Sequence, residues 1–216
     1  MNEAVPGARP LANAGAVVLA LTLLCMATLD RPLALYMKAA VDGDTLAIWQ
    51  TITRLGDATG YVIAALLLLV IAGAGRRVLT PGRRRAALDR LFRYNLLLLL
   101  GLALSGAAVN GLKIALGRLR PRYLFESGAS GFQPLNFDVS ANTLPSGHAQ
   151  VSFALAAVLW LAWPRWAPVI VAGAATVALS RVVVTTHYLS DVLLGAYLGV
   201  AAVLLLAPRL LDSPRP

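Results

Sequence analysis

Both histidines of this 216-residue chain lie in short polar clusters that interrupt apolar sequence. His148 ends the run Pro145-Ser146-Gly147-His148, and His187 stands four residues before Asp191. Histidine has the unperturbed pKa nearest to neutral pH, so it is the usual residue for proton transfer and nucleophilic attack at pH 7. The two clusters therefore indicate a site with chemistry rather than ordinary packing positions.

The second cluster contains an imidazole and a carboxylate at helical spacing. On a helix, His187 and Asp191 at i and i+4 would lie on one face. A carboxylate that binds one imidazole nitrogen fixes the tautomer and leaves the other nitrogen free to attack. The alternative is a capping pair at the start of the last helix, with Ser190 or Asp191 as the cap, and both interpretations can hold at once.

Cations and helix-start residues accompany the histidines. Lys113, Arg118, Arg120 and Arg122 fall within ten residues at the end of an apolar stretch, which is costly unless an anion compensates them. Snorkelling to lipid phosphates is the simpler alternative for this cluster alone, and for Arg118 and Arg122 in particular.

The run before His148 favours an anion as well. Ser146 can cap a helix, Gly147 lets the backbone approach a ligand, and free amides at a helix start attract anions. The alternative is an ordinary helix entry. Arg181 adds a further cation near His187.

These residue types suit phosphoryl transfer without a metal. Cations can neutralise the equatorial oxygens, one histidine can attack phosphorus, and the other can protonate the leaving oxygen. A zinc or iron site would need three or four convergent ligands, and here two histidines stand among cations that would repel a metal ion. We therefore expect no metal and no cofactor.

The composition is that of a membrane protein. Hydrophobic residues make up 58% and charged residues 13% of the chain, about half the charge of a typical soluble domain. A net charge of +9 can indicate nucleic acid binding, but most arginines flank apolar stretches, so a positive-inside bias explains the charge better. We expect no nucleic acid partner. Cys25 is the single cysteine, so no intramolecular disulfide can form.

Six apolar stretches predict an all-α integral membrane bundle of six transmembrane helices in a single domain over residues 1–216. They run approximately over 12–29, 58–75, 94–115, 149–162, 168–186 and 192–207. A signal peptide is the alternative for the first stretch, but Thr28-Leu29-Asp30-Arg31 offers a poor cleavage site. Residues 45–55 are a candidate for a short interfacial helix.

The loops predict the orientation. Residues 75–93 hold seven arginines against one aspartate, so this loop should be cytoplasmic. Both termini, with Arg9, Arg209 and Arg215, would then also be cytoplasmic. Counting spans from this loop brings all three polar clusters to the outer face of the cell inner (cytoplasmic) membrane, facing the periplasm or exterior.

The clusters match a known three-part signature at every fixed position. It consists of a lysine, six residues and Arg-Pro; then Pro-Ser-Gly-His; then Ser-Arg, five residues, His, three residues and Asp. Here these segments run from Lys113 to Pro121, from Pro145 to His148 and from Ser180 to Asp191. The chain thus resembles the type 2 phosphatidic acid phosphatase superfamily, also called lipid phosphate phosphatases.

The resemblance implies the role of each site residue. His187 would be the nucleophile that forms a phosphohistidine, Asp191 would orient it, and His148 would be the general acid and then the base. Substrate binding would fall to Lys113, Arg120, Ser146, the Gly147 amide and Arg181. The resemblance also implies a metal-independent reaction on a lipid that enters sideways between helices. The expected partners are this lipid phosphate and the bilayer, with no obligate protein partner.

The substrate and the reaction type stay open at this point. Undecaprenyl diphosphate, phosphatidylglycerol phosphate, phosphatidate and lipid A phosphates are candidate substrates for hydrolysis. Transfer of the phosphate to an acceptor lipid is the alternative, and a non-catalytic lipid-phosphate binder or flippase is a third hypothesis. Vanadate-dependent haloperoxidases share the signature but are soluble. In the outer loop 123–144, where headgroup choice is expected, Phe125, Phe132 and Phe137 would form an apolar lid or dip into the interface.

Overall fold

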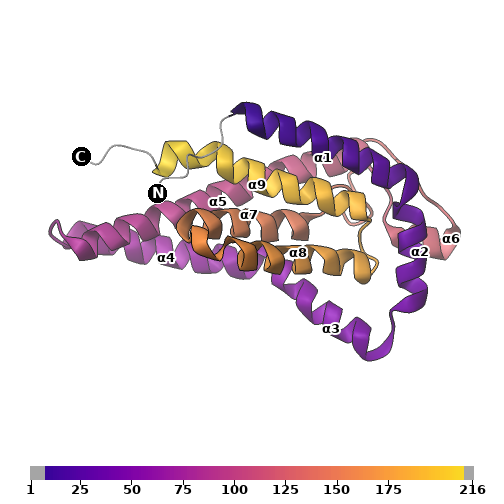
Figure 1. Ribbon diagram of the computed structural model, residues 1–216, viewed down its shortest axis with the longest axis horizontal. Helices are drawn as coiled ribbons and strands as arrows, with labels where there is room; N and C mark the ends of the chain where they lie inside the picture. The colour runs from indigo at the N-terminus through magenta and orange to yellow at the C-terminus, as the bar shows by residue number, and fades with distance from the viewer. Residues whose placement is uncertain (1–7, 212–216) are drawn as a thin grey trace.

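The computed structural model describes residues 8–211, and these fold into helices joined by short connections and by one long loop over residues 128–146 (Figure 1). Arg215, which was expected on the cytoplasmic side, lies outside the described residues. The α-helices are α1 (Ala8–Thr28), α2 (Asp30–Ala40), α3 (Gly43–Thr53), α4 (Ala58–Val78), α5 (Arg83–Leu116), α6 (Pro121–Ser127), α7 (Gly147–Ala162), α8 (Ala167–Val183) and α9 (Leu189–Leu211), with 3₁₀ turns η1 (Arg54–Gly56) and η2 (Pro164–Trp166). The prediction of an all-α membrane fold is confirmed.

Each of the six predicted apolar stretches coincides with a helix. Within residues 8–211, five segments are long and apolar enough to cross a membrane, and they contain α1, α4, α5, α8 and α9. The sixth stretch is α7, whose 16 residues extend roughly 24 Å at about 1.5 Å per residue. The short helix expected within residues 45–55 is present as α3.

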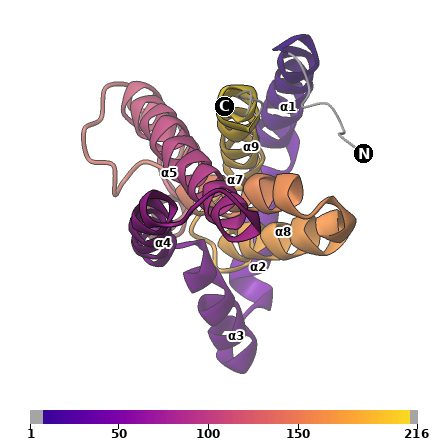
Figure 2. The ribbon, with the colours of Figure 1, turned by 90° about the vertical axis from the view of Figure 1, so that its left-hand side faces the viewer.

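The long helices run side by side, and the short ones gather at one end. In Figure 1, α2, α3 and α6 lie at one end of the molecule and the connection from α4 to α5 lies at the other. The view along the bundle in Figure 2 shows α7 enclosed by its neighbours, in agreement with its contacts to α5, α8 and α9. The starts of α7 and α9 and the ends of α5 and α8 therefore meet at the end that carries α2, α3 and α6 (Figure 1).

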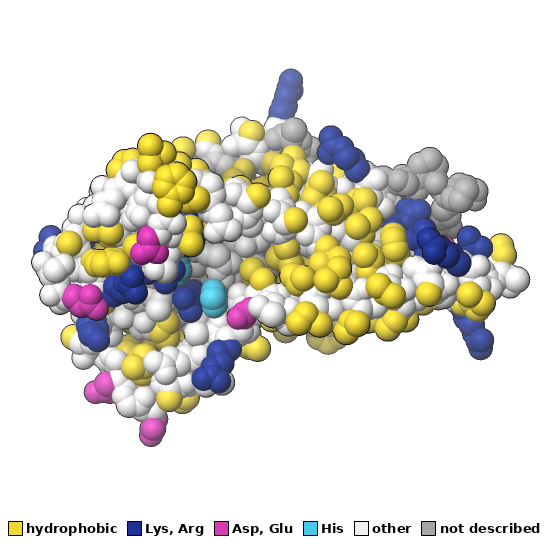
Figure 3. Space-filling view, turned by 180° about the vertical axis from the view of Figure 1, so that it is seen from behind, with side chains coloured by type: hydrophobic (Ala, Val, Ile, Leu, Met, Phe, Trp, Pro, Cys, Tyr) yellow, Lys and Arg dark blue, Asp and Glu magenta, His cyan; other side chains and the backbone are white. Residues whose placement is uncertain are grey.

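The surface shows an apolar belt between two charged ends (Figure 3). Leu66, Leu67, Val70 and Ile71 of α4 are among the exposed apolar side chains. Arginines gather where α4 meets α5, and the histidines appear at the opposite end (Figure 3). This distribution is typical of a lipid-facing surface bounded by two aqueous interfaces.

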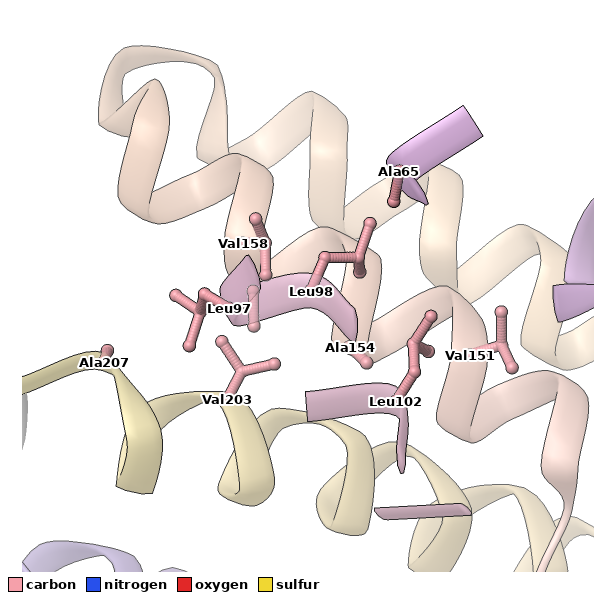
Figure 4. Close-up of a cluster of buried hydrophobic side chains, with 10 residues drawn as sticks. Ala65, Leu97, Leu98, Leu102, Val151, Ala154, Val158, Val203 and Ala207 are labelled. Atoms are coloured by element: carbon pink, nitrogen blue, oxygen red, sulfur yellow. The ribbon is translucent and has the colours of Figure 1, made fainter. Parts of the chain in front are cut away.

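Small residues bring α7 and α9 close together beside the buried core. The core is formed by α4, α5, α7 and α9 (Figure 4), and its fully enclosed members include Leu97, Ala154 and Val203. A Cβ atom on Gly195 would lie 2.3 Å from the carbonyl oxygen of Ser146, and one on Gly199 would lie 2.3 Å from the carbonyl oxygen of Gln150. Such close backbone approach is common in membrane bundles, and here it holds the starts of α7 and α9 together.

Candidate active site

The imidazole of His187 contacts Asp191, but the two residues are not on one helix face as predicted. His187 lies in the turn before α9, which begins at Leu189. Its Nδ1 is 3.5 Å from Oδ2 of Asp191. The turn before α9 brings the two side chains together. The predicted contact is therefore present, but the prediction that both residues lie on one helix was wrong.

Thr143 joins the same pair and defines the tautomer. Its hydroxyl donates to Oδ2 of Asp191 at 2.5 Å and lies 3.0 Å from Nδ1 of His187. The hydroxyl has one hydrogen, which the carboxylate takes because a carboxylate only accepts. Nδ1 of His187 must then donate, and Nε2 keeps its lone pair. Within residues 8–211, Nε2 has no hydrogen-bond partner, so it is the nitrogen available for attack.

Asp191 also caps α9. Its Oδ2 accepts the backbone N–H of Tyr188 at 2.8 Å, an acidic side chain in the first turn reaching back to the residue that precedes the helix. The capping interpretation and the catalytic interpretation of Asp191 are therefore compatible, because one carboxylate serves both contacts.

His187 is held neutral at neutral pH. Burial of the ring lowers the pKa of His187 to about 3; Asp191 acts in the opposite direction, and the charges of Lys113 and Arg181 lower the pKa further. A neutral imidazole has the free electron pair that nucleophilic attack requires.

Backbone carbonyls from one loop gather two of the expected cations. The carbonyl oxygen of Asn142 accepts from Nζ of Lys113 at 2.9 Å and from Nε of Arg120 at 3.3 Å. Burial, followed by the neighbouring charge of Arg122, lowers the pKa of Arg120. Lys113 and Arg120 therefore lie side by side against the loop that carries Thr143.

The third expected cation has an unused donor. Nη1 of Arg181 donates to Thr53 at the end of α3 at 2.7 Å, whereas its Nε is buried and has no hydrogen-bond partner among residues 8–211. A buried polar group normally has a partner. An anionic ligand that received this N–H would satisfy it.

The same cations also act electrostatically on His148. It is half-buried at the start of α7 and packs against η1, where a Cβ on Gly56 would lie 2.8 Å from its side chain. Lys113 and Arg181 interact electrostatically with both His148 and His187. The cations are thus within range of both imidazoles.

Ser146 and Gly147 lie at the start of α7. Ser146 is fully buried and its Oγ accepts from the backbone N–H of Ala149 at 3.5 Å, so it caps the helix. Apart from its chain neighbours and the backbone of its own helix, no described residue has an atom within 4 Å of the Cβ position of Gly147, which leaves open space there. All eight predicted site residues therefore lie at one end of the bundle.

Arg118 is a correction to the sequence analysis. It was expected to snorkel toward lipid headgroups, but it is buried and pairs with Asp191 at 2.7 Å and with Asp30 at 2.8 Å. Arg122, by contrast, is exposed and donates to the hydroxyl of its neighbour Tyr123. Spacing cannot distinguish the two arginines, because the partner Asp30 lies 88 positions away in the sequence.

The predicted lid aromatics do not pack as a closed cover. Phe137 is 77% and Phe132 49% exposed, while the ring of Phe125 lies 5.8 Å from Nζ of Lys38 in α2. Exposure of this kind fits side chains that dip into a membrane interface better than a packed lid.

The chain is similar to known proteins of one enzyme family. The model of the PAP2 superfamily matches residues 94–213. A lipid A 1-phosphatase from Rhizobium johnstonii is 29% identical over 183 residues, which cover 85% of this chain and 74% of the relative. A lipid A 1-phosphatase from Rhizobium etli is 30% identical over 150 residues, which cover 69% of this chain and 65% of the relative.

A solved structure supports the fold. The PAP2 type phosphatidylglycerolphosphate phosphatase from Bacillus subtilis superposes with a TM-score of 0.65 at 23% identity, over 95% of this chain and 98% of that one. The predicted resemblance and the predicted enzyme class, a membrane lipid phosphatase, are confirmed: the chain belongs to the PAP2 superfamily.

Proposed function

We propose that this protein hydrolyses a lipid phosphate through a phosphohistidine at His187. The observation that carries the proposal is the arrangement around that residue: Thr143 and Asp191 orient a neutral imidazole, and its Nε2 has no hydrogen-bond partner in the described part of the chain. Cations lie within electrostatic range of the same ring, so a phosphate held by them would be close to the nucleophile. A site that only bound phosphate would need the cations but not the oriented imidazole.

The proposed reaction has two steps. Nε2 of His187 attacks phosphorus, the bond from phosphorus to the lipid oxygen breaks, and His148 gives its proton to that leaving oxygen. His148 then takes a proton from water, the hydroxide oxygen bonds to phosphorus, and the phosphorus–nitrogen bond breaks to release inorganic phosphate. Lys113, Arg120 and Arg181 stabilise the charge on the equatorial oxygens, together with Ser146 and the Gly147 amide.

The substrate we propose is a lipid A phosphate at position 1. Support comes from the two Rhizobium relatives, which are lipid A 1-phosphatases. A groove of about 240 Å³ also runs along α7 and α8, from Ser152 one turn beyond His148 to Leu159. Its lining is mostly aliphatic and includes Leu155, Val169 and Gly173, which suits part of an acyl chain.

We further propose six membrane spans with the site on the outer face. The arginine-rich connection between α4 and α5 would lie in the cytoplasm by the positive-inside rule, and the histidines lie at the opposite end of the apolar belt (Figure 3). The shorter α7 would then begin below the outer surface, so that the lipid phosphate is reached at the level of the headgroups.

Phosphate release from the purified protein in detergent tests the proposal. Lipid A, phosphatidylglycerol phosphate, phosphatidate and undecaprenyl diphosphate should be compared with chelator present, using His187→Ala as the matched control. We expect metal-independent release that is fastest with lipid A and absent in the variant. Equal release from both proteins would overturn the enzymatic role of His187, and a faster rate with another lipid would overturn the substrate. Adding an acceptor lipid and analysing its product separates transfer from hydrolysis.

A further inference from the structure

A buried ion network links the start of α2 to the carboxylate that orients His187. Arg118 lies at its centre: Nη1 donates to Oδ1 of Asp191 at 2.7 Å and Nη2 donates to Oδ2 of Asp30 at 2.8 Å. Ser190 completes the network, because it accepts from Nη1 of Arg118 at 2.6 Å and its backbone N–H donates to Oδ1 of Asp30 at 3.1 Å. The hydroxyl of Ser190 also contacts Asp30.

The network is closed to solvent. Arg118 is 8% and Asp30 3% exposed, while Asp191 and Ser190 are fully buried. The ring of Tyr188 covers the guanidinium at 4.3 Å. Inside a protein such pairs interact more strongly than at a surface, and removing one partner leaves the other charge uncompensated.

The two oxygens of Asp191 have separate tasks. Oδ1 faces Arg118, whereas Oδ2 faces His187, Thr143 and the N–H of Tyr188. Fixing Oδ1 therefore fixes the rotation of the carboxylate and aims Oδ2 at the imidazole. Arg118 in turn is held by Asp30, whose negative charge offsets the guanidinium and leaves more of the charge of Asp191 available to His187.

Asp30 comes from a part of the chain that the family model does not include. The match begins at residue 94, whereas Asp30 opens α2 at the corner with α1, and Figure 1 shows this corner beside the start of α9. We propose that Asp30 and Arg118 are positioning residues for the catalytic reaction: through Asp191 they set the orientation and basicity of His187, so that the α1–α2 corner completes the active site. This inference rests on His187 being the nucleophile, as proposed above.

A double-mutant cycle tests the inference. Wild type, Asp30→Asn, Asp191→Asn and the double variant should be purified in detergent, and kcat and KM should be measured on the most active lipid phosphate. We expect D30N alone to lower kcat about 10-fold, with KM within twofold. In the D191N background, D30N should have little further effect, because its route to His187 is already interrupted.

Two further variants separate positioning from folding. Arg118→Lys keeps the charge but loses the two-sided contact, so its kcat should lie between those of wild type and Arg118→Gln. Arg122→Gln, at the exposed arginine of the same segment, should retain wild-type kcat and KM. Melting temperatures in detergent show whether each variant is folded.

Several outcomes would overturn the inference. They are a D30N kcat within twofold of wild type, a D30N loss of the same size with and without Asp191, or an R118K variant no better than R118Q. His187→Ala is assayed beside these variants, and phosphate release by wild type but not by His187→Ala supports the proposed function. If the predictions for Asp30 and Arg118 fail while wild type and His187→Ala still differ in phosphate release, only this inference is overturned.

Discussion

The backbone N–H of Ser146 donates to the carbonyl oxygen of Asp191 at 2.9 Å. This bond joins the segment that carries His148 to the segment that carries His187, although the two are far apart in sequence. It lies where Gly195 allows the backbone of α9 to approach that of α7. The relative position of the two imidazoles is therefore set by main-chain packing as well as by side-chain contacts.

Gly195→Ala should damage the site through this contact. The added Cβ would lie 2.3 Å from the carbonyl oxygen of Ser146, so α7 and α9 must separate, at a cost of roughly 1–3 kcal/mol for an overpacked core. We expect a lower melting temperature and a kcat reduced at least 10-fold.

Two glycines serve as controls for this change. Gly199→Ala meets the carbonyl oxygen of Gln150 one turn further along α9, so it should lose similar stability with a smaller loss of kcat. Gly173→Ala in α8 has open space and should be neutral. Equal losses of kcat in G195A and G199A would contradict a specific link to the site.

Thr143 should be needed for its hydroxyl. Thr143→Val keeps the shape but removes the group between His187 and Asp191, and a hydrogen bond to a charged group contributes about 1.5–3 kcal/mol. If that contribution is made in the transition state, kcat falls about 10- to 100-fold. Thr143→Ser should stay near wild type. A T143V enzyme with unchanged kcat would show that Asp191 alone orients the ring.

The free energy of unfolding should depend on pH through the titration of His187. Its folded pKa is lowered to about 3 by burial, below an unfolded value of about 6.5. Between these values the unfolded state binds a proton that the folded state does not, so the free energy of unfolding decreases as pH falls, by up to about 1.4 kcal/mol per pH unit. Above pH 6.5 the contribution to stability is fully present.

Melting temperatures at pH 7 and pH 4.5 check this titration. His187→Asn removes the titrating group, so its melting temperature should decrease less over this interval than that of wild type. Groups that do not interact with His187 titrate alike in both proteins and cancel in the comparison. Parallel decreases would mean that His187 is not the group that resists protonation.

Local sequence patterns were sufficient to predict the six apolar helices and α3, whereas α2 and α6 were not expected. Apolar runs and their arginine flanks define α4 and α5, and the short helix α3 was expected within residues 45–55. These features depend on neighbours within one or two turns, which a single sequence displays. The three signature segments could likewise be identified from type and spacing alone.

Contacts across long separations could not be predicted. Arg118 looked like its neighbour Arg122, since nothing near it in sequence shows that Asp30 and Asp191 would enclose it. Thr143 was overlooked for the same reason, because its two partners lie 44 and 48 positions away. Helical spacing predicted that His187 and Asp191 lie on one helix face, whereas in the structure a turn before α9 brings them together.

The groove along α7 and α8 predicts a difference between long and short substrates. Gly173→Leu places a side chain into open space within the groove lining and should displace about two methylene groups of a bound chain. At roughly 0.8 kcal/mol for each buried methylene, kcat/KM for a long-chain lipid phosphate should fall about 10-fold. A short-chain, water-soluble phosphate ester should be hydrolysed at the wild-type rate.

The matched control is Gly106→Leu, a helical glycine of α5 with open space that is not part of the groove lining, and it should spare both substrates. Equal losses on both substrates in G173L would indicate a disturbed helix instead of an occupied groove, and wild-type kinetics on the long-chain substrate would place the acyl chain elsewhere.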